Sequence, residues 1–130
     1  MRSTRRKVRV KRSRSRRRPA ATESVTFDTV RQLALALPGV EEGLSYGTPA
    51  FRVRGKLLAR LREDGDSLVV KIDFAEREVL MEADPQTFYI TDHYRNYPAL
   101  LVRLSTVDVD ALRELLEDAW RRAAPKRLVS

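Results

Sequence analysis

Residues 51–62 read Phe51-Arg52-Val53-Arg54-Gly55-Lys56-Leu57-Leu58-Ala59-Arg60-Leu61-Arg62. The odd positions of this stretch are apolar and most even positions are basic, which is the alternation of half-buried strands. For the apolar positions to face each other, Val53 should pair with Leu57 around a three-residue loop, Arg54-Gly55-Lys56. The stretch therefore predicts a β-hairpin with one apolar face and one basic face.

Further strands are predicted after this hairpin. The turn Asp64-Gly65-Asp66 leads to residues 67–72, where Leu68, Val70 and Ile72 point inward. Residues 88–90 read as a short extended piece and residues 99–104 as a mostly buried strand. Two apolar side chains, Leu58 and Val69, are expected on the outer face of the sheet, and they favour a segment that covers part of that face.

Three helices complete the expected domain, and each begins at a capping residue: Thr26 for residues 26–37, Asp73 for residues 73–83 and Asp108 for residues 108–123. The last helix has an apolar stripe that includes Trp120. Residues 41–43 read as a loop. The expected order is α-β-β-β-α-β-β-α, an α+β domain over residues 25–130 whose antiparallel sheet has helices packed against it.

The positive charge is concentrated in an N-terminal tail. Of the 26 Lys and Arg residues, 11 lie between Arg2 and Arg18, where there is no acid; residues 19–130 hold 26 − 11 = 15 basic and 18 acidic residues, a net charge of −3. Residues 1–24 are expected to be disordered, because they have almost no apolar surface to bury. They are either a nucleic-acid-binding arm, or an expendable extension or the result of a misplaced start codon.

The composition argues against several classes of protein. The chain has no Cys, no apolar run of the ~20 residues that span a bilayer and no secretory signal, so we expect a cytoplasmic protein that makes no membrane contact. Its single histidine, His93, is a poor basis for a metal site, and neither a nucleophile-elbow motif nor a phosphate-binding glycine pattern is present. We therefore expect a non-enzymatic protein without a metal or cofactor.

Four segments resemble the MmcQ/YjbR family of small bacterial proteins. They are, in chain order, Phe27-Asp28-Thr29-Val30-Arg31, then Leu44-Ser45-Tyr46-Gly47-Thr48-Pro49-Ala50-Phe51-Arg52-Val53-Arg54-Gly55-Lys56, then His93-Tyr94-Arg95-Asn96-Tyr97-Pro98, and Ala119-Trp120-Arg121-Arg122. The resemblance covers residues 25–128. It implies an α+β domain described as a double-wing, DNA-binding-like fold, with DNA binding proposed largely from shape.

The hairpin is the first candidate site, because it carries five basic residues and no acid from Thr48 to Arg62. Strand parity places four of them on one sheet face with a further lysine from the next strand, and such a row can meet successive phosphates. An ordinary solvated face is the alternative. The candidate nucleic-acid contacts are Arg52, Arg54, Lys56, Arg60, Arg62, Lys71 and Arg95, with Lys126, Arg127 and the tail as auxiliary contacts.

An aromatic cleft is the second candidate site, and it would take a small ligand or a protein. The loop after residue 92 interleaves aromatic rings with a base and an amide, a mixture found at stacking surfaces. The structural alternative is that the rings anchor the loop to the core, with Tyr94 and Arg95 the residues expected to be exposed. The cleft would be formed by Tyr46, His93, Tyr94 and Tyr97.

Overall fold

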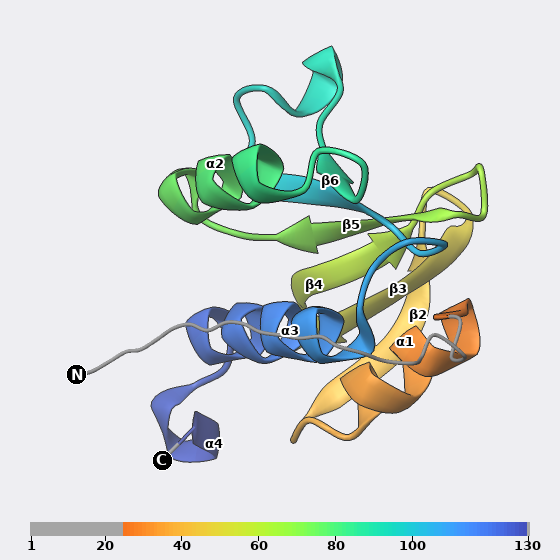
Figure 1. Ribbon diagram of the computed structural model, residues 1–130. Coiled ribbons are helices and arrows are strands. Elements are labelled where there is room, and N and C mark those ends of the chain that lie inside the picture. The colour runs from red at the N-terminus through yellow and green to blue at the C-terminus, as the bar shows by residue number, and fades with distance from the viewer. Residues whose placement is uncertain (1–24, 130) are drawn as a thin grey trace.

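The computed structural model describes residues 25–129, and Figure 1 shows their arrangement. The disorder expected for residues 1–24 lies outside the described residues. In chain order the elements are α1 (Phe27–Leu35), β2 (Val40–Ser45), β3 (Thr48–Val53), β4 (Lys56–Leu61), β5 (Ser67–Lys71), α2 (Phe74–Ala83), β6 (Phe88–Tyr89), the 3₁₀ helix η2 (Asp92–Tyr94), β7 (Ala99–Arg103), α3 (Val109–Ala123) and α4 (Lys126–Val129).

The strands form one antiparallel sheet of six strands in the order β2-β3-β4-β5-β7-β6. Helices α1 and α3 lie side by side against one face, and α2 lies beside the far end of the sheet, near β6 (Figure 1). The predicted α+β class, with an antiparallel sheet and packed helices, is confirmed. The other face of the sheet carries no long helix in the described part of the chain.

The sheet contains one strand more than the sequence predicted. Residues 41–43 were expected to form a loop, but they belong to the edge strand β2, which pairs with β3 from Val40↔Val53 to Ser45↔Thr48. The connecting residues Tyr46 and Gly47 both have positive φ, 54° and 83°, as a two-residue type I′ turn requires.

The hairpin of β3 and β4 has a shorter loop than expected. Val53 pairs with Lys56, not with Leu57, and the loop is only Arg54-Gly55. These two residues have φ values of 53° and 81°, so this is a second type I′ turn, whose twist matches that of the flanking strands. The prediction of a three-residue loop was wrong because it assumed unbroken alternation along β4.

A β-bulge restores the alternation on β4. The register shifts between Phe51 and Arg52, so that Arg52 pairs with Leu57 while Phe51 pairs with Ala59. Leu58 is the additional residue, and both Leu58 and Ala59 are fully buried in the main core. Leu58 therefore faces the helices, which corrects its predicted place on the outer face.

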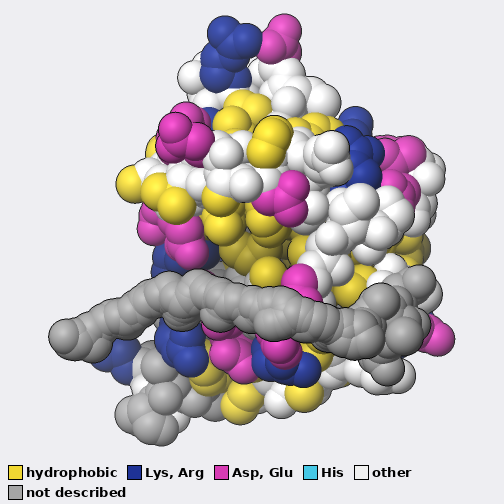
Figure 2. All heavy atoms as spheres, in the orientation of Figure 1, with side chains coloured by type: hydrophobic (Ala, Val, Ile, Leu, Met, Phe, Trp, Pro, Cys, Tyr) yellow, Lys and Arg dark blue, Asp and Glu magenta, His cyan; other side chains and the backbone are white. Residues whose placement is uncertain are grey.

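The helices begin as predicted and enclose the main core against the sheet. The side chains of Thr26, Asp73 and Asp108 each accept a backbone hydrogen bond at a helix start. Trp120 of α3 is only 7% exposed, and its Nε1 donates to the carbonyl oxygen of Pro38 at 2.8 Å. This bond ties α3 to the chain that follows α1. Hydrophobic side chains remain visible between α2 and α3 (Figure 2).

A smaller apolar cluster lies on the other face of the sheet. Val69, Ala99 and Leu101 are covered there by Tyr94, with Tyr89 and Ile90 packed against them. The predicted covering of Val69 is thus confirmed. Tyr94 is buried, in contrast to its expected exposure, because its ring is the cover.

Acidic side chains face each other where α2 and α3 approach. Burial, and then repulsion from Asp118, raises the pKa of Glu76 on α2. Burial also raises the pKa of Glu114 on α3, together with repulsion from Asp118 and Asp110. The ionised forms of both carboxyl groups are therefore less favourable here than in water.

No helix in the described part of the chain is long and apolar enough to cross a membrane.

Replacing Trp120 by Ala should cost ~3–5 kcal/mol of unfolding free energy, a large part of the ~5–15 kcal/mol of a small domain, because a large buried side chain and its hydrogen bond are both lost. Urea unfolding followed by circular dichroism measures this cost. Arg121→Ala, an exposed change one residue further along α3, is the control and should stay within about 1 kcal/mol. Equal unfolding midpoints for the two variants would contradict the packing of α3.

Replacing Glu114 by Gln should stabilise the protein at pH 7 and change little below pH ~4, near the unfolded pKa of glutamate. The folded-state pKa is raised, so the favourable contribution of Glu114 is present at low pH and is lost as the pH rises through that pKa. Thermal midpoints at the two pH values measure the effect. Glu82→Gln, an exposed change on α2, is the control; a stabilisation that is the same at both pH values would contradict the mechanism.

Candidate functional site

Strand register places Arg60 beside Ala50 and Val69 on the sheet face opposite α1 and α3. Arg52 lies two residues from Ala50, and Lys71 lies two residues from Val69, so both share this face. Arg62 also follows the parity of Arg60. The register agrees with the predicted common face for these four cations, whereas Arg54, the fifth member of the predicted row, lies in the β3–β4 turn. The surroundings of the four differ.

Arg60 is held in place by the protein itself. Its side chain is only 11% exposed, and its guanidinium donates to the Thr48 hydroxyl at 3.2 Å and to the Tyr94 hydroxyl at 3.3 Å. The Glu63 carboxylate lies 3.6 Å away, and the Tyr46 ring centroid lies 5.3 Å from Cζ of Arg60. Arg60 therefore supports the outer face and has little freedom to reach a phosphate.

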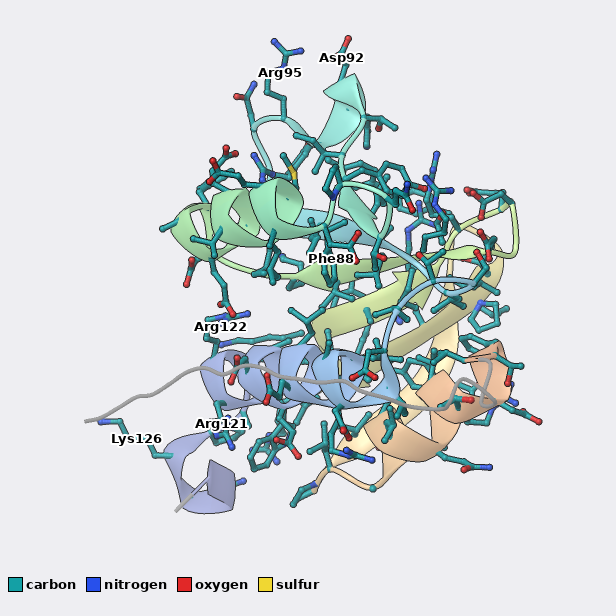
Figure 3. The ribbon with its side chains drawn as sticks, in the orientation of Figure 1. Phe88, Asp92, Arg95, Arg121, Arg122 and Lys126 are labelled. Atoms are coloured by element: carbon teal, nitrogen blue, oxygen red, sulfur yellow. The ribbon has the colours of Figure 1, made fainter. Side chains whose placement is uncertain are left out.

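Three other predicted contacts are also engaged. Arg52 donates to the Leu44 carbonyl oxygen at 3.2 Å, and Arg62 lies 3.9 Å from the Asp64 carboxylate. Arg95 pairs with Asp92 at 2.5 Å. Figure 3 shows the last pair projecting from one end of the molecule, away from Arg122 and Lys126.

The predicted aromatic cleft takes the form of a cluster around Arg60. We use "aromatic cluster" for Tyr46, His93, Tyr94 and Tyr97. Tyr46 is 86% exposed over Arg60, while Tyr94 is buried beneath it. The centroid of the His93 ring lies 4.8 Å from that of Tyr94 and 5.8 Å from that of Tyr97. Tyr97 is 56% exposed. The two candidate sites therefore meet at one arginine.

A buried arginine that the sequence analysis did not single out holds the loop of this cluster. Arg77 of α2 donates to the carbonyl oxygens of Tyr94, Tyr97 and Ala99 at 3.0, 2.8 and 3.1 Å, and to that of Arg95 at 3.0 Å. It is only 4% exposed. Backbone dipoles surround its charge, and no carboxylate lies within 4 Å in the described part of the chain, so Arg77 fixes the path of residues 94–99.

Four exposed cations that have no carboxylate within 4 Å in the described part of the chain lie at a different place, the end of the sheet next to the hairpin turn. We call Arg54, Lys56, Lys71 and Arg122 the basic edge. All four are exposed, and among the described residues none has a carboxylate within 4 Å of its charged nitrogens. They come from the β3–β4 turn, from β4, from β5 and from the last turn of α3.

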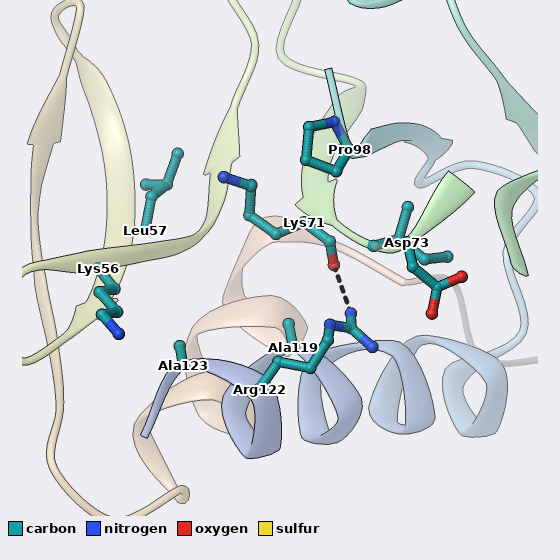
Figure 4. A pocket seen from close by; sticks show the side chains of 9 residues that line it. Lys56, Leu57, Lys71, Asp73, Pro98, Ala119, Arg122 and Ala123 are labelled. Carbon is teal, nitrogen blue, oxygen red and sulfur yellow. Dashed lines mark hydrogen bonds between the residues drawn. The ribbon is translucent and has the colours of Figure 1, made fainter. Parts of the chain in front are cut away.

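The hairpin register explains how Lys56 joins this group. Because Lys56 pairs directly with the core residue Val53, its side chain points to the helix side of the sheet. Strands β4 and β5 pair only from Ala59↔Val70 to Leu61↔Leu68 and separate beyond that point. A pocket of about 430 Å³ lies in the gap, and Figure 4 shows cationic side chains on different sides of it.

Arg122 belongs to the site but was not among the candidate contacts. Its Nη2 donates to the carbonyl oxygen of Lys71 at 3.0 Å, a bond drawn in Figure 4. In the sequence it is one of several charged residues on the exposed side of a helix, so no local pattern distinguished it. For Arg77 as well, the helix pattern gave no signal of burial.

Metal-binding chemistry has little support in this geometry. The described residues contain no group of three or more His, Asp or Glu side chains placed to hold a metal ion. His93 lies against two tyrosine rings, and the described part of the chain gives it no carboxylate partner within 4 Å.

Two consecutive hairpins and helices on one face of an antiparallel sheet define a small α+β domain, and the comparisons identify its family. The sequence model of the YjbR family matches residues 35–122, more than half of the chain. The chain belongs to the YjbR family, as the resemblance implied.

Two relatives and one solved structure that are similar to this chain come from bacteria. Uncharacterized protein Mb2600 of Mycobacterium bovis and Uncharacterized protein Rv2570 of Mycobacterium tuberculosis are each 39% identical to it, over 80% of this chain and 92% of the relative. The crystal structure of Deinococcus radiodurans protein DR2400, which carries a DUF419 domain, is similar with a TM-score of 0.65 and 26% identity. That match covers 75% of this chain and 77% of the other.

Replacing Arg77 by Met should destabilise the protein by ~3 kcal/mol or more, because each buried acceptor left without a donor costs ~1–3 kcal/mol. Urea unfolding measures the loss, and amide hydrogen exchange should become faster in residues 92–98. Arg113→Met on the exposed side of α3 is the matched control. If Arg77→Met left exchange in this loop unchanged, Arg77 would not be what holds it.

Proposed function

We propose that this protein binds nucleic acid without catalysing a reaction, and that the basic edge is its main contact with phosphate groups. The observation that carries the proposal is that some cations pair with carboxylates of the protein and others do not. Arg60, Arg62 and Arg95 each lie within 4 Å of a carboxylate, whereas among the described residues no carboxylate lies that close to the cations of the basic edge. Cations that are not paired with a carboxylate are the ones able to neutralise phosphates and release counterions.

The shape of the basic edge suits contact with a phosphate backbone. The hairpin turn with Arg54 and Lys56 projects at the end of the sheet, and Lys71 and Arg122 lie beside it on neighbouring elements. Contacts of this kind position a protein on nucleic acid but carry no base information, so the proposed binding has weak sequence preference. The implied double-wing character of the family and the 11 basic residues of the tail are consistent with such a partner.

Replacing Arg54, Lys56 and Lys71 together by Gln should weaken the salt dependence of duplex DNA binding. The slope of log affinity against log salt concentration should become less steep by about 2.7, since each lost phosphate contact contributes about 0.9. The measurement uses residues 25–130, so that the basic tail cannot mask the effect, after circular dichroism has shown that this chain folds. Fluorescence anisotropy at ~50–200 mM salt gives the slopes.

The matched control replaces Arg62, Arg95 and Arg121 by Gln, which removes the same charge from side chains that already pair with acids. Its slope should change much less. Absence of binding at ~50 mM salt, where phosphate contacts are only weakly screened, would refute the proposal. An equal change in both triple variants would show that only net charge matters.

The aromatic cluster supports a second candidate function, the binding of a small ligand or a protein. The specific observation is Tyr46, which is held in the left-handed region with its ring largely exposed over Arg60. An exposed ring stacked on a guanidinium can take a flat partner on its free side. If DNA binding fails, perturbation of the Tyr46 and Tyr97 resonances by a candidate ligand is the test of this alternative.

A further inference from the structure

A pocket lies within the basic edge, and three of its four cations, Lys56, Lys71 and Arg122, line this pocket. It has a volume of about 430 Å³, within the range of small-molecule sites. It opens where β4 and β5 separate, and the C-terminal half of α3 closes it from below in Figure 4. Its lining comes from the ends of β4 and β5, from the segments at Asp73 and Pro98, and from the last turns of α3.

The charges of this lining favour a dianion. Three cations face one carboxylate, Asp73, which gives a formal net charge of +2. The Asp73 side chain accepts the Glu76 amide at 2.8 Å as the N-cap of α2, so that oxygen is already bonded. A terminal phosphate monoester carries about −1.5 to −2 near neutral pH, whereas an internal phosphodiester carries one charge. The charge balance therefore matches a phosphate end better than a point within a strand.

The donors of Arg122 are oriented before any ligand binds. Its Nη2 is bonded to the Lys71 carbonyl oxygen, which fixes the guanidinium beside the pocket. A guanidinium has five N–H donors, and this is the only hydrogen bond that Arg122 makes within the described residues. The remaining donors, with the amino groups of Lys56 and Lys71, can be shared among the three oxygens of a phosphate.

The rest of the lining is apolar and favours an organic ligand over inorganic phosphate. Leu57 and Pro98 lie on the walls of the pocket, and the alanines at 119 and 123 leave space above α3 (Figure 4). Ile72 is the remaining apolar residue of the lining. A phosphate alone would leave this surface uncovered. An organic phosphate of nucleotide size would place its body against the apolar walls and its phosphate at the cations.

We propose that this pocket binds the terminal phosphate of an organic phosphate. One source of this chemistry is a free phosphorylated metabolite. The other is the phosphorylated end of a nucleic-acid strand, and in that form the inference rests on the function proposed above.

Two pairs of probes test the proposal on the full chain, by isothermal titration calorimetry and amide chemical-shift mapping. One pair is AMP and adenosine; the other is a single-stranded oligonucleotide with a 5′-phosphate and the same oligonucleotide with a 5′-hydroxyl. The phosphorylated member of at least one pair should bind about tenfold more tightly, as one or two additional charge-assisted hydrogen bonds imply. Shifts should centre on Leu57, Lys71 and Ala123.

Variants assign this preference to the pocket. Lys71→Gln and Arg122→Gln should each reduce it about tenfold. Arg121→Gln removes the same charge from a residue paired with Asp118 and should leave the preference intact. Ala123→Leu keeps the charge and fills the floor, so it should also weaken binding of the phosphorylated probe; circular dichroism confirms folding of each variant.

Each outcome supports or overturns one proposal. A preference confined to AMP identifies a free metabolite as the source, and a preference confined to the 5′-phosphorylated oligonucleotide identifies a strand end. No preference in either pair, or a preference that Arg122→Gln leaves unchanged, overturns the pocket proposal. If 5′-hydroxyl duplex still bound at the basic edge, the proposed function would stand although the pocket proposal had failed. If AMP bound and no duplex did, the proposed function would be refuted and the pocket proposal would stand.

Discussion

The left-handed backbone at Arg54-Gly55 is the constraint on which the rest of this structure depends. A two-residue turn with both φ values positive pairs Val53 with Lys56 and therefore directs the Lys56 side chain toward the helices. The bulge at Leu58 then returns Ala59 and Leu61 to the core. Had the loop contained three residues, Lys56 would lie within it, and the pocket beside α3 would lose one of its three cations.

The surroundings of each cation matter more for function than the number of cations. The N–H groups of Arg60 and Arg77 donate hydrogen bonds to other groups of the protein. Arg60 links β4 to Tyr94 on the outer face, and Arg77 binds the carbonyl oxygens of the loop that contains Tyr94. Together they hold Tyr94 and the loop that contains it in place. The exposed side chains of Lys56 and Lys71 make no such bonds within the described residues, which leaves them able to bind an anion.

Much of the fold followed from local patterns. Caps at Thr26, Asp73 and Asp108 marked the helix starts, and alternation marked β3, β4 and β5. The edge strand β2 was missed because its side chains are mostly polar and exposed, so it has no apolar alternation. Its one signal was Tyr46-Gly47, a pair that resembles Arg54-Gly55 in having glycine second, where a type I′ turn requires positive φ.

By itself, the sequence determined the α+β class, the buried face of α3 with Trp120, and the common sheet face of Arg52, Arg60, Arg62 and Lys71, because periodicity and capping are local properties of the chain. The family followed from the resemblance of its motifs. Only the tertiary structure decided which of the cations are occupied. Arg60 meets Tyr94 across 34 residues and Arg122 meets Lys71 across 51, and no pattern within one helix or strand encodes such contacts. The pocket arises in the same way, from strands that part beside a helix far away in the sequence.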